Sequence, residues 1–106
     1  MDAVLRALAD PSRRRILQLV RDQELPAGHI AARFALTRPA VSQHVRVLRE
    51  AGLLSERREG TRRLYRARSE AIEALQEELA AFWDSRLAQL KREAEAEQEA
   101  RDAAAD

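Results

Sequence analysis

The 106 residues of the chain are 45% apolar and 35% charged and include no cysteine, which excludes a disulfide scaffold, a thiolate metal site, a redox cysteine pair and a cysteine nucleophile. A chain this short forms one small domain that buries only about two-thirds of its unfolded surface, so we expect a second chain to cover part of its apolar surface. Residues 1–69 hold 15 basic and 7 acidic residues (+8), whereas residues 70–106 hold 4 basic and 11 acidic residues (−7). The net charge of +1 therefore conceals a basic first part of the chain, which favours a polyanionic partner such as nucleic acid.

Three short helices are predicted in the first third of the chain. The first covers residues 2–9 and is interrupted at Asp10-Pro11, because proline disfavours a helical residue before it. Asp10 is a suitable cap for a second helix that starts at Pro11 and fades after Val20. Leu25-Pro26 begins a third helix, which runs over residues 27–34.

A fourth helix is predicted after a turn of three residues. Thr37 is a good cap for it, Pro39 lies in its first turn, and Gly52 supplies a left-handed stop after Ala51. Two short helices joined by a three-residue turn are typical of the helix-turn-helix motif.

The hydrophobic period changes after Gly52. Residues 53–59 and 62–68 are two candidate strands, joined by Gly60-Thr61 into a two-stranded hairpin, or wing. Ser69 then caps a long helix whose apolar stripe continues to Leu90. Residues 91–106 are rich in helix formers but nearly empty of large apolar groups, so we expect a charged helical extension that frays or is disordered, beside a domain of residues 1–90.

The polar face of the fourth helix is the best candidate for base recognition. With Val41, Val45 and Leu48 turned inward, the opposite face carries donors and acceptors suited to base edges in the major groove, with arginine suited to guanine and glutamine to adenine. The predicted base-reading residues are Arg38, Pro39, Ser42, Gln43 and Arg46. An ordinary solvated polar face is the alternative.

Two arginine clusters are candidate phosphate contacts. Arg13, Arg14 and Arg15 span too much of a helix to face one partner together, so we expect one or two of them to be solvated or paired with Asp10 and Asp2. A hairpin tip without apolar groups has no structural need for four guanidinium groups, which favours DNA contact. The predicted wing residues are Arg57, Arg58, Arg62 and Arg63.

Three stretches of the chain together resemble the ArsR/SmtB family of bacterial winged helix-turn-helix repressors. They are LADPSRRRILQLV (8–20), LPAGHIAARFALTRPAVSQHVRVLREAGLL (25–54) and RREGTRRLYRA (57–67). The resemblance implies a mainly α, winged helix-turn-helix fold with a long C-terminal dimerisation helix. It also implies a homodimer whose helix 37–51 enters the major groove, with Thr37 and His44 on its DNA backbone side.

The apolar stripe of the last helix is too long for one small domain to cover, so we expect it to be buried against the first helix and a twofold mate. The predicted dimer interface comprises Val4, Leu5, Leu8, Ile72, Leu75, Leu79, Phe82, Trp83 and Leu90.

The sequence departs from the metal sensors of that family. The family's thiolate sensors use a cysteine pair on the helix that corresponds to residues 27–34, and its interfacial sensors use histidines on the last helix, whereas residues 70–106 contain no histidine. Carboxylates such as Asp84 and Glu93 alone select poorly for a transition metal. We therefore expect no metal and no cofactor, and an unidentified small-molecule effector at the dimer interface, near Phe82 and Trp83, as the remaining candidate input.

Catalysis is not expected either. Ser42 and His44 lie two positions apart and so face different sides of a helix, and His29 has no second histidine four positions on. No apolar run reaches the length of about 18 residues that a membrane span needs, and the charged amino terminus does not resemble a signal peptide, so the sequence predicts a cytoplasmic protein without a membrane partner.

These observations favour a homodimeric, sequence-specific DNA-binding transcriptional regulator, a repressor, that binds a pseudo-palindromic operator. Two alternatives stay open: a weakly specific architectural DNA-binding protein, and a protein-interaction module that uses the helix over residues 70–90.

Overall fold

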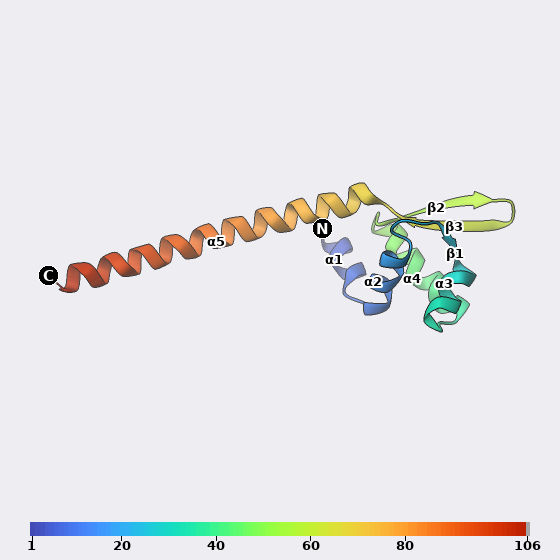
Figure 1. The fold of residues 1–106 in the computed structure, drawn as a ribbon, viewed down its shortest axis with the longest axis horizontal. Coiled ribbons are helices and arrows are strands. Elements are labelled where there is room, and N and C mark those ends of the chain that lie inside the picture. Colours follow the sequence, from blue (N-terminus) through green and yellow to red (C-terminus); the bar gives the residue numbers. More distant parts are fainter. Residues whose placement is uncertain (106) are drawn as a thin grey trace. The chain divides into compact units, whose positions relative to one another are not determined.

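The computed structural model of the chain describes residues 1–105 and divides them into two compact units, one from Met1 to Glu73 and one from Ala74 onward. The first unit is built from four short helices and a small sheet (Figure 1). The helices are α1 (Asp2–Leu8), α2 (Pro11–Leu19), α3 (Ala27–Phe34) and α4 (Arg38–Glu50). The strands are β1 (Leu25–Pro26), β2 (Leu54–Glu59) and β3 (Arg62–Ala67), and α5 (Ser69–Ala105) begins in the first unit and makes up the second.

The predicted helix boundaries are confirmed to within a residue or two, because the caps form as expected. The Asp10 carboxylate accepts hydrogen bonds from the amides of Ser12 at 2.7 Å and Arg13 at 3.2 Å. Thr37 caps α4 through its hydroxyl, which accepts from the amide of Ala40 at 3.2 Å. Gly52 adopts the left-handed conformation with φ of 78° and ends the helix as predicted. Ser69 is itself the first helical residue of α5 rather than a cap outside it.

The sheet has three strands in the order β1-β3-β2, all antiparallel. The predicted hairpin and the helix predicted over residues 27–34 are confirmed, but Leu25-Pro26, predicted to begin that helix, adds a third strand to the sheet. These two residues pair with Tyr65 and Leu64 as an edge strand, where a proline is tolerated because only one side of the strand is hydrogen-bonded to a neighbour. A residue that precedes proline is also biased toward extended backbone.

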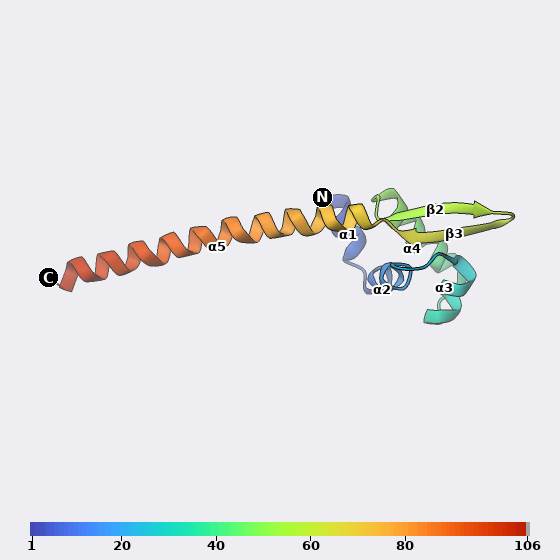
Figure 2. The same cartoon turned by 45° about the horizontal axis from the view of Figure 1, so that its top comes forward.

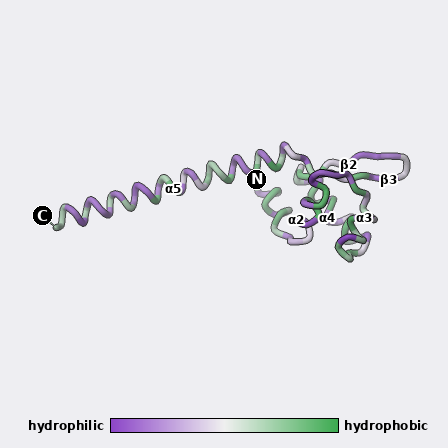
Figure 3. The backbone as a smooth tube through the Cα atoms, in the orientation of Figure 1, coloured by the Kyte–Doolittle hydropathy of each residue, from purple (hydrophilic) through white to green (hydrophobic). Residues whose placement is uncertain are grey.

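The hairpin of β2 and β3 forms a wing that extends from the helices of the first unit, as both views show (Figures 1 and 2). Glu59 pairs with Arg62 across the Gly60-Thr61 turn, in which Gly60 has a φ of 63°. Hydrophilic residues predominate along β2 (Figure 3).

The core of the first unit lies between α2, α3, α4 and the base of the hairpin. Backbone hydrogen bonds from Ala67 to Val20 (3.0 Å) and from Arg68 to Leu53 (2.9 Å) join the end of β3 to this core. The side chains that are fully buried there are Ile16, Val20, Ile30, Val41, Leu48, Leu53 and Leu54.

The last helix, α5, continues without a break through residues 91–105. It carries no buried residue in this structure, and the prediction that its charged end frays or is disordered stays a prediction.

The turn between α3 and α4 contains a strained position. Ala35 ends α3 in the left-handed conformation, with φ of 54°, and is the one non-glycine residue with positive φ in the part of the chain that the structure describes. Because glycine pays no Cβ penalty there, Ala35→Gly is expected to raise the free energy of unfolding by about 0.5–1 kcal/mol. Chemical denaturation checks this, with Ala32→Gly as a control: Ala32 lies in the exposed interior of α3, so that substitution should destabilise by about 1 kcal/mol. Equal losses from both variants would contradict the strain assigned to Ala35.

Candidate nucleic-acid interface

Helix α4 is held to the core by one face and presents a polar face to solvent. Val41, Val45 and Leu48 are buried, so the rotation of the helix about its axis is fixed. The face turned away from the core is exposed and carries Pro39, Ser42, Gln43, Arg46 and Glu50, and Arg38, also exposed, lies at the start of the helix on the side toward α3. The structure therefore places four of the five predicted base-reading residues on one accessible face, with Arg38 at its edge.

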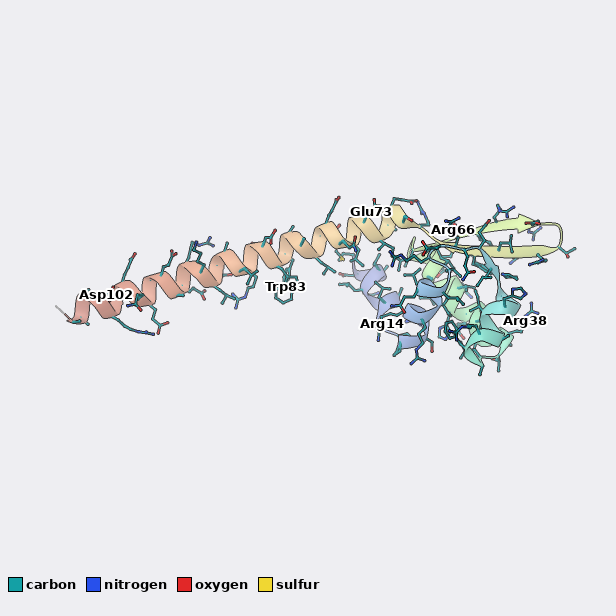
Figure 4. All side chains as sticks on the ribbon, in the orientation of Figure 1. Arg14, Arg38, Arg66, Glu73, Trp83 and Asp102 are labelled. Carbon is teal, nitrogen blue, oxygen red and sulfur yellow. The ribbon has the colours of Figure 1, made fainter. Side chains whose placement is uncertain are left out.

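The two arginines of this face have different surroundings. The guanidinium of Arg38 (labelled in Figure 4) lies over Gly28 of α3, where a Cβ would be 3.4 Å from its Nη1 atom. Arg46 pairs with Glu50 at 3.1 Å, one turn further along α4. Both side chains of that pair are more than 60% exposed, so the pair contributes little energy and leaves Arg46 able to turn toward a base.

His44 lies between the exposed and the buried sides of α4. Its Nδ1 atom is buried and has no hydrogen-bond partner among the described residues. The carboxylate of Asp10 lies near this imidazole. Desolvation acts to raise the pKa of Asp10. The hydrogen bonds from the amides of Arg13 and Ser12 and the nearby His44 outweigh this effect, so the pKa of Asp10 is lowered overall. His44 thus lies near the Asp10 cap of α2, and its predicted contact with the DNA backbone, like that of the exposed Thr37, stays a prediction.

Two arginines near the tip of the wing have no ion-pair partner in the part of the chain that the structure describes. Arg58 and Arg62 are exposed and make no ion pair within residues 1–105. Arg58 lies directly opposite Arg63 on the neighbouring strand. Like charges at opposed positions destabilise a strand pair. The carboxylate of Glu56, 3.5 Å from the Nε of Arg63, offsets part of that repulsion, and a polyanion such as a DNA backbone would offset more of it.

Arg57 has a structural role within the protein, and its predicted contact with the DNA backbone stays a prediction. Its guanidinium donates two hydrogen bonds of 3.0 Å to the carboxylate of Glu24, and a third of 3.1 Å to Glu59. The hydrogen bond from Arg57 lowers the pKa of Glu24, and the same bond raises the pKa of Arg57. The pair joins the wing to the loop before β1. Glu24 is 33 positions away in the sequence, so no local pattern could reveal this contact.

Arg13 and Arg14 join α1 to α2 through hydrogen bonds to backbone carbonyls, and a phosphate contact by any of Arg13, Arg14 and Arg15 stays a prediction. Arg13 donates to the carbonyl of Ala7 at 2.6 Å and to that of Arg6 at 3.0 Å, and it lies 3.7 Å from the carboxylate of Asp10. Arg14 donates to the carbonyl of Leu8 at 2.7 Å. These carbonyls lie in the last turn of α1, where the acceptors lack i+4 helical partners; that of Arg6 also accepts from the amide of Ala9 at 3.2 Å.

The predicted interface residues fall into two groups. Val4, Leu8 and Ile72 are half-buried and pack partly against the core of their own protomer, so the first helix offers less free apolar surface than the sequence suggested. Leu75 is also half-buried. Phe82 and Trp83 are more than 55% exposed and pack edge to face with their centroids 5.5 Å apart, and Trp83 projects from α5 in Figure 4. The other large apolar side chains that are exposed are Met1, Leu5, Leu79, Leu87 and Leu90.

The described residues offer neither a metal site nor a membrane span. In residues 1–105 no group of three or more histidine, aspartate or glutamate side chains is arranged to hold a metal ion. None of the described helices combines the length and the apolar character that crossing a membrane requires.

The arrangement defines a class of protein. A helix is anchored to its neighbour across a three-residue turn and exposes a polar face, and an arginine-bearing hairpin follows it. Together these features form a winged helix-turn-helix domain of the DNA-binding type.

Comparisons with known proteins agree with this class and give the family. A helix-turn-helix domain family matches residues 8–57. The HTH-type transcriptional regulator Rv2034 of Mycobacterium tuberculosis is 40% identical over 82 residues, which are 77% of each chain. The transcriptional repressor SdpR of Bacillus subtilis is 38% identical over 60 residues, which are 57% of this chain and 67% of that protein.

A solved structure is similar over most of the chain. It is the NMR structure of the homodimeric winged helix-turn-helix DNA-binding domain Mb0332 of Mycobacterium bovis, described as a possible ArsR-family transcriptional regulator. It matches with a TM-score of 0.65 and 31% identity over 78% of this chain and 77% of that one. The chain belongs to the ArsR/SmtB family of winged helix-turn-helix transcriptional regulators, as its sequence motifs predicted.

Proposed function

We propose that the protein is a homodimeric repressor that binds a pseudo-palindromic operator without a metal ion. Each α4 helix enters the major groove of one half-site, and the two half-sites lie about one turn of DNA, or roughly 34 Å, apart. The observation that carries the proposal is the exposed polar face of α4, fixed in rotation by Val41, Val45 and Leu48. Occupancy of the operator is the whole of the activity, and no reaction is catalysed.

The base-reading residues are tested by Gln43→Ala and Arg46→Ala. Each substitution is expected to weaken operator binding by about 1–3 kcal/mol and to relax the preference at one defined base pair. The measurement is fluorescence anisotropy on an operator duplex, obtained by selection from a random pool, and on a scrambled duplex. Equal losses on both duplexes would assign these side chains to phosphate contact instead.

The wing is tested by the salt dependence of binding. Arg58→Ala and Arg62→Ala are each expected to flatten the slope of log K against log salt concentration by about 0.9 for each phosphate that the variant no longer neutralises. Arg57→Ala is the matched control, because its guanidinium is already bonded to Glu24 and Glu59 and should change the slope less. A slope unchanged by the first two substitutions would mean that the wing does not contact the DNA backbone.

Dimerisation is proposed because of the exposed apolar surface of α5. Leu79, Phe82, Trp83, Leu87 and Leu90 lie exposed along one helix, and a soluble monomer rarely leaves so many large apolar side chains uncovered. We propose that a second copy of the chain, related by a twofold axis, covers this surface and that Leu5 of the first helix contributes to the interface. A protein that binds an inverted repeat requires such a twofold dimer.

An input signal would act at this same interface. An effector releases DNA only if it binds the non-operator arrangement more tightly, so it must contact Phe82, Trp83 or their neighbours differently in the two states. The helix offers neither cysteine nor histidine there, which favours an organic effector over a metal ion.

A further inference from the structure

Glu56 lies at the centre of a polar network that joins α4, the helix with the predicted base-reading residues, to both strands of the wing. Its carboxylate accepts a hydrogen bond of 2.7 Å from the guanidinium of Arg49, in the last turn of α4. It also lies 3.5 Å from the Nε of Arg63 and accepts from the hydroxyl of Tyr65 at 3.4 Å, and both of those residues belong to β3. One carboxylate of β2 therefore contacts α4 and the neighbouring strand at the same time.

The surroundings of Glu56 differ from those of the other acidic residues of the wing. Its side chain is 23% exposed, whereas that of Glu59, on the same strand, is 64% exposed and pairs only with Arg57 among the described residues. Burial raises the pKa of Tyr65, and the negative charge of Glu56 raises it further. The Arg49 contact is short, charge-assisted and partly shielded from water, which makes it stronger than an ordinary surface pair.

The charge of Glu56 is unfavourable for an interface with DNA. A carboxylate near the phosphates repels them, and this one also draws Arg63 toward itself. Electrostatics alone would therefore favour a neutral residue at this position. The benefit of Glu56 must come from what its contacts hold in place.

We propose that Glu56 is a positioning residue that fixes the orientation of the wing relative to α4, so that the wing arginines and the reading helix meet one duplex together. The inference rests on the proposed DNA binding. The bond to Arg49 fixes the base of β2 on the end of α4, and the contacts to Arg63 and Tyr65 keep β3 aligned with it. Without this contact the wing would be more mobile in the free protein. DNA binding would then have to order it, and the conformational entropy lost would weaken the affinity.

The test compares the effects on DNA affinity of two substitutions that change the charge of the protein equally. Glu56→Gln and Glu59→Gln each remove one negative charge from β2, but only the first disturbs a contact to α4. Glu56→Gln is expected to weaken binding to the selected operator duplex about three- to tenfold, which corresponds to a coupling within the usual range for residues of one network. Glu59→Gln is expected to leave affinity unchanged or to raise it slightly at low salt.

Two further variants separate positioning from charge and from folding. Glu56→Asp keeps the charge but shortens the side chain, so it should weaken binding nearly as much as Glu56→Gln. In the Glu56→Gln background, Arg62→Ala should weaken binding less than it does in the original protein, because a misplaced wing already reaches fewer phosphates. Circular dichroism and thermal unfolding of each variant confirm that the fold is intact.

The outcomes distinguish the two proposals. If the original protein selects no duplex, the proposed function fails, and this inference fails with it. If it does select one and Glu56→Gln binds that duplex as tightly as Glu59→Gln does, Glu56 acts only by its charge and the positioning role is overturned.

Discussion

A chain that ends at Glu78 is expected to lose both dimerisation and operator selectivity. The truncation removes Leu79, Phe82, Trp83, Leu87 and Leu90, which are all exposed in a single copy. Burying a large apolar side chain contributes about 1.5–3 kcal/mol, and a micromolar dimer requires only about 8 kcal/mol in total. These side chains are 39–61% exposed, so each gains about half of that amount on burial, and five from each protomer contribute roughly 8–15 kcal/mol, as much as such a dimer requires. One reading helix alone contacts too few bases for selectivity.

The matched control is a chain that ends at Leu90. It removes the charged extension, residues 91–106, which carries no large apolar side chain and is net acidic. Dimerisation and affinity should stay nearly unchanged in this variant. Analytical ultracentrifugation and anisotropy on the same samples give both readouts. A stable, operator-selective monomer from the shorter chain would contradict the dimeric mechanism.

Arg13→Ala is expected to lower the free energy of unfolding by about 2–3 kcal/mol. The guanidinium of Arg13 is mostly buried and donates to two carbonyls at the end of α1, and hydrogen bonds that involve a charged group contribute about 1.5–3 kcal/mol. The end of α1 then keeps only the hydrogen bonds from Arg14 to Leu8 and from the amide of Ala9 to Arg6. Because Leu5 of that helix belongs to the proposed interface, dimer affinity should fall as well.

The control for this prediction is the adjacent Arg15→Ala. Arg15 is exposed and makes no ion pair in residues 1–105, so the same loss of charge should change the free energy of unfolding by less than about 0.5 kcal/mol. Urea denaturation measures both variants. Similar small effects from the two substitutions would mean that α1 is held by its apolar contacts alone.

Local patterns in the sequence were sufficient to predict most of the fold. Asp10, Thr37 and Gly52 mark helix boundaries through their own side chains or backbone, so their positions are visible in the sequence. The edge strand at Leu25-Pro26 was missed because two residues carry no periodicity, and its pairing partner lies far along the chain at Tyr65.

The candidate site was predictable to the extent that one helix builds it. A helical wheel is enough to place Ser42, Gln43 and Arg46 on one exposed face. The partners of the arginines were not predictable in the same way, since Arg13 binds backbone carbonyls and Arg57 binds a distant glutamate. An arginine that is free to contact DNA and one that is paired within the protein are both simply arginine in the sequence. Only the folded structure distinguishes the two.

Selection of duplexes from a random DNA pool by the whole protein tests the proposed repressor most directly. The recovered sequences are predicted to contain an inverted repeat whose half-site centres lie about one helical turn, or roughly 10 base pairs, apart. Insertion of about five base pairs between the half-sites should abolish tight binding, because it places the second half-site on the opposite side of the duplex. Recovery of no enriched sequence, with binding that still weakens steeply as salt is added, would contradict sequence-specific repression and indicate a DNA-coating protein instead.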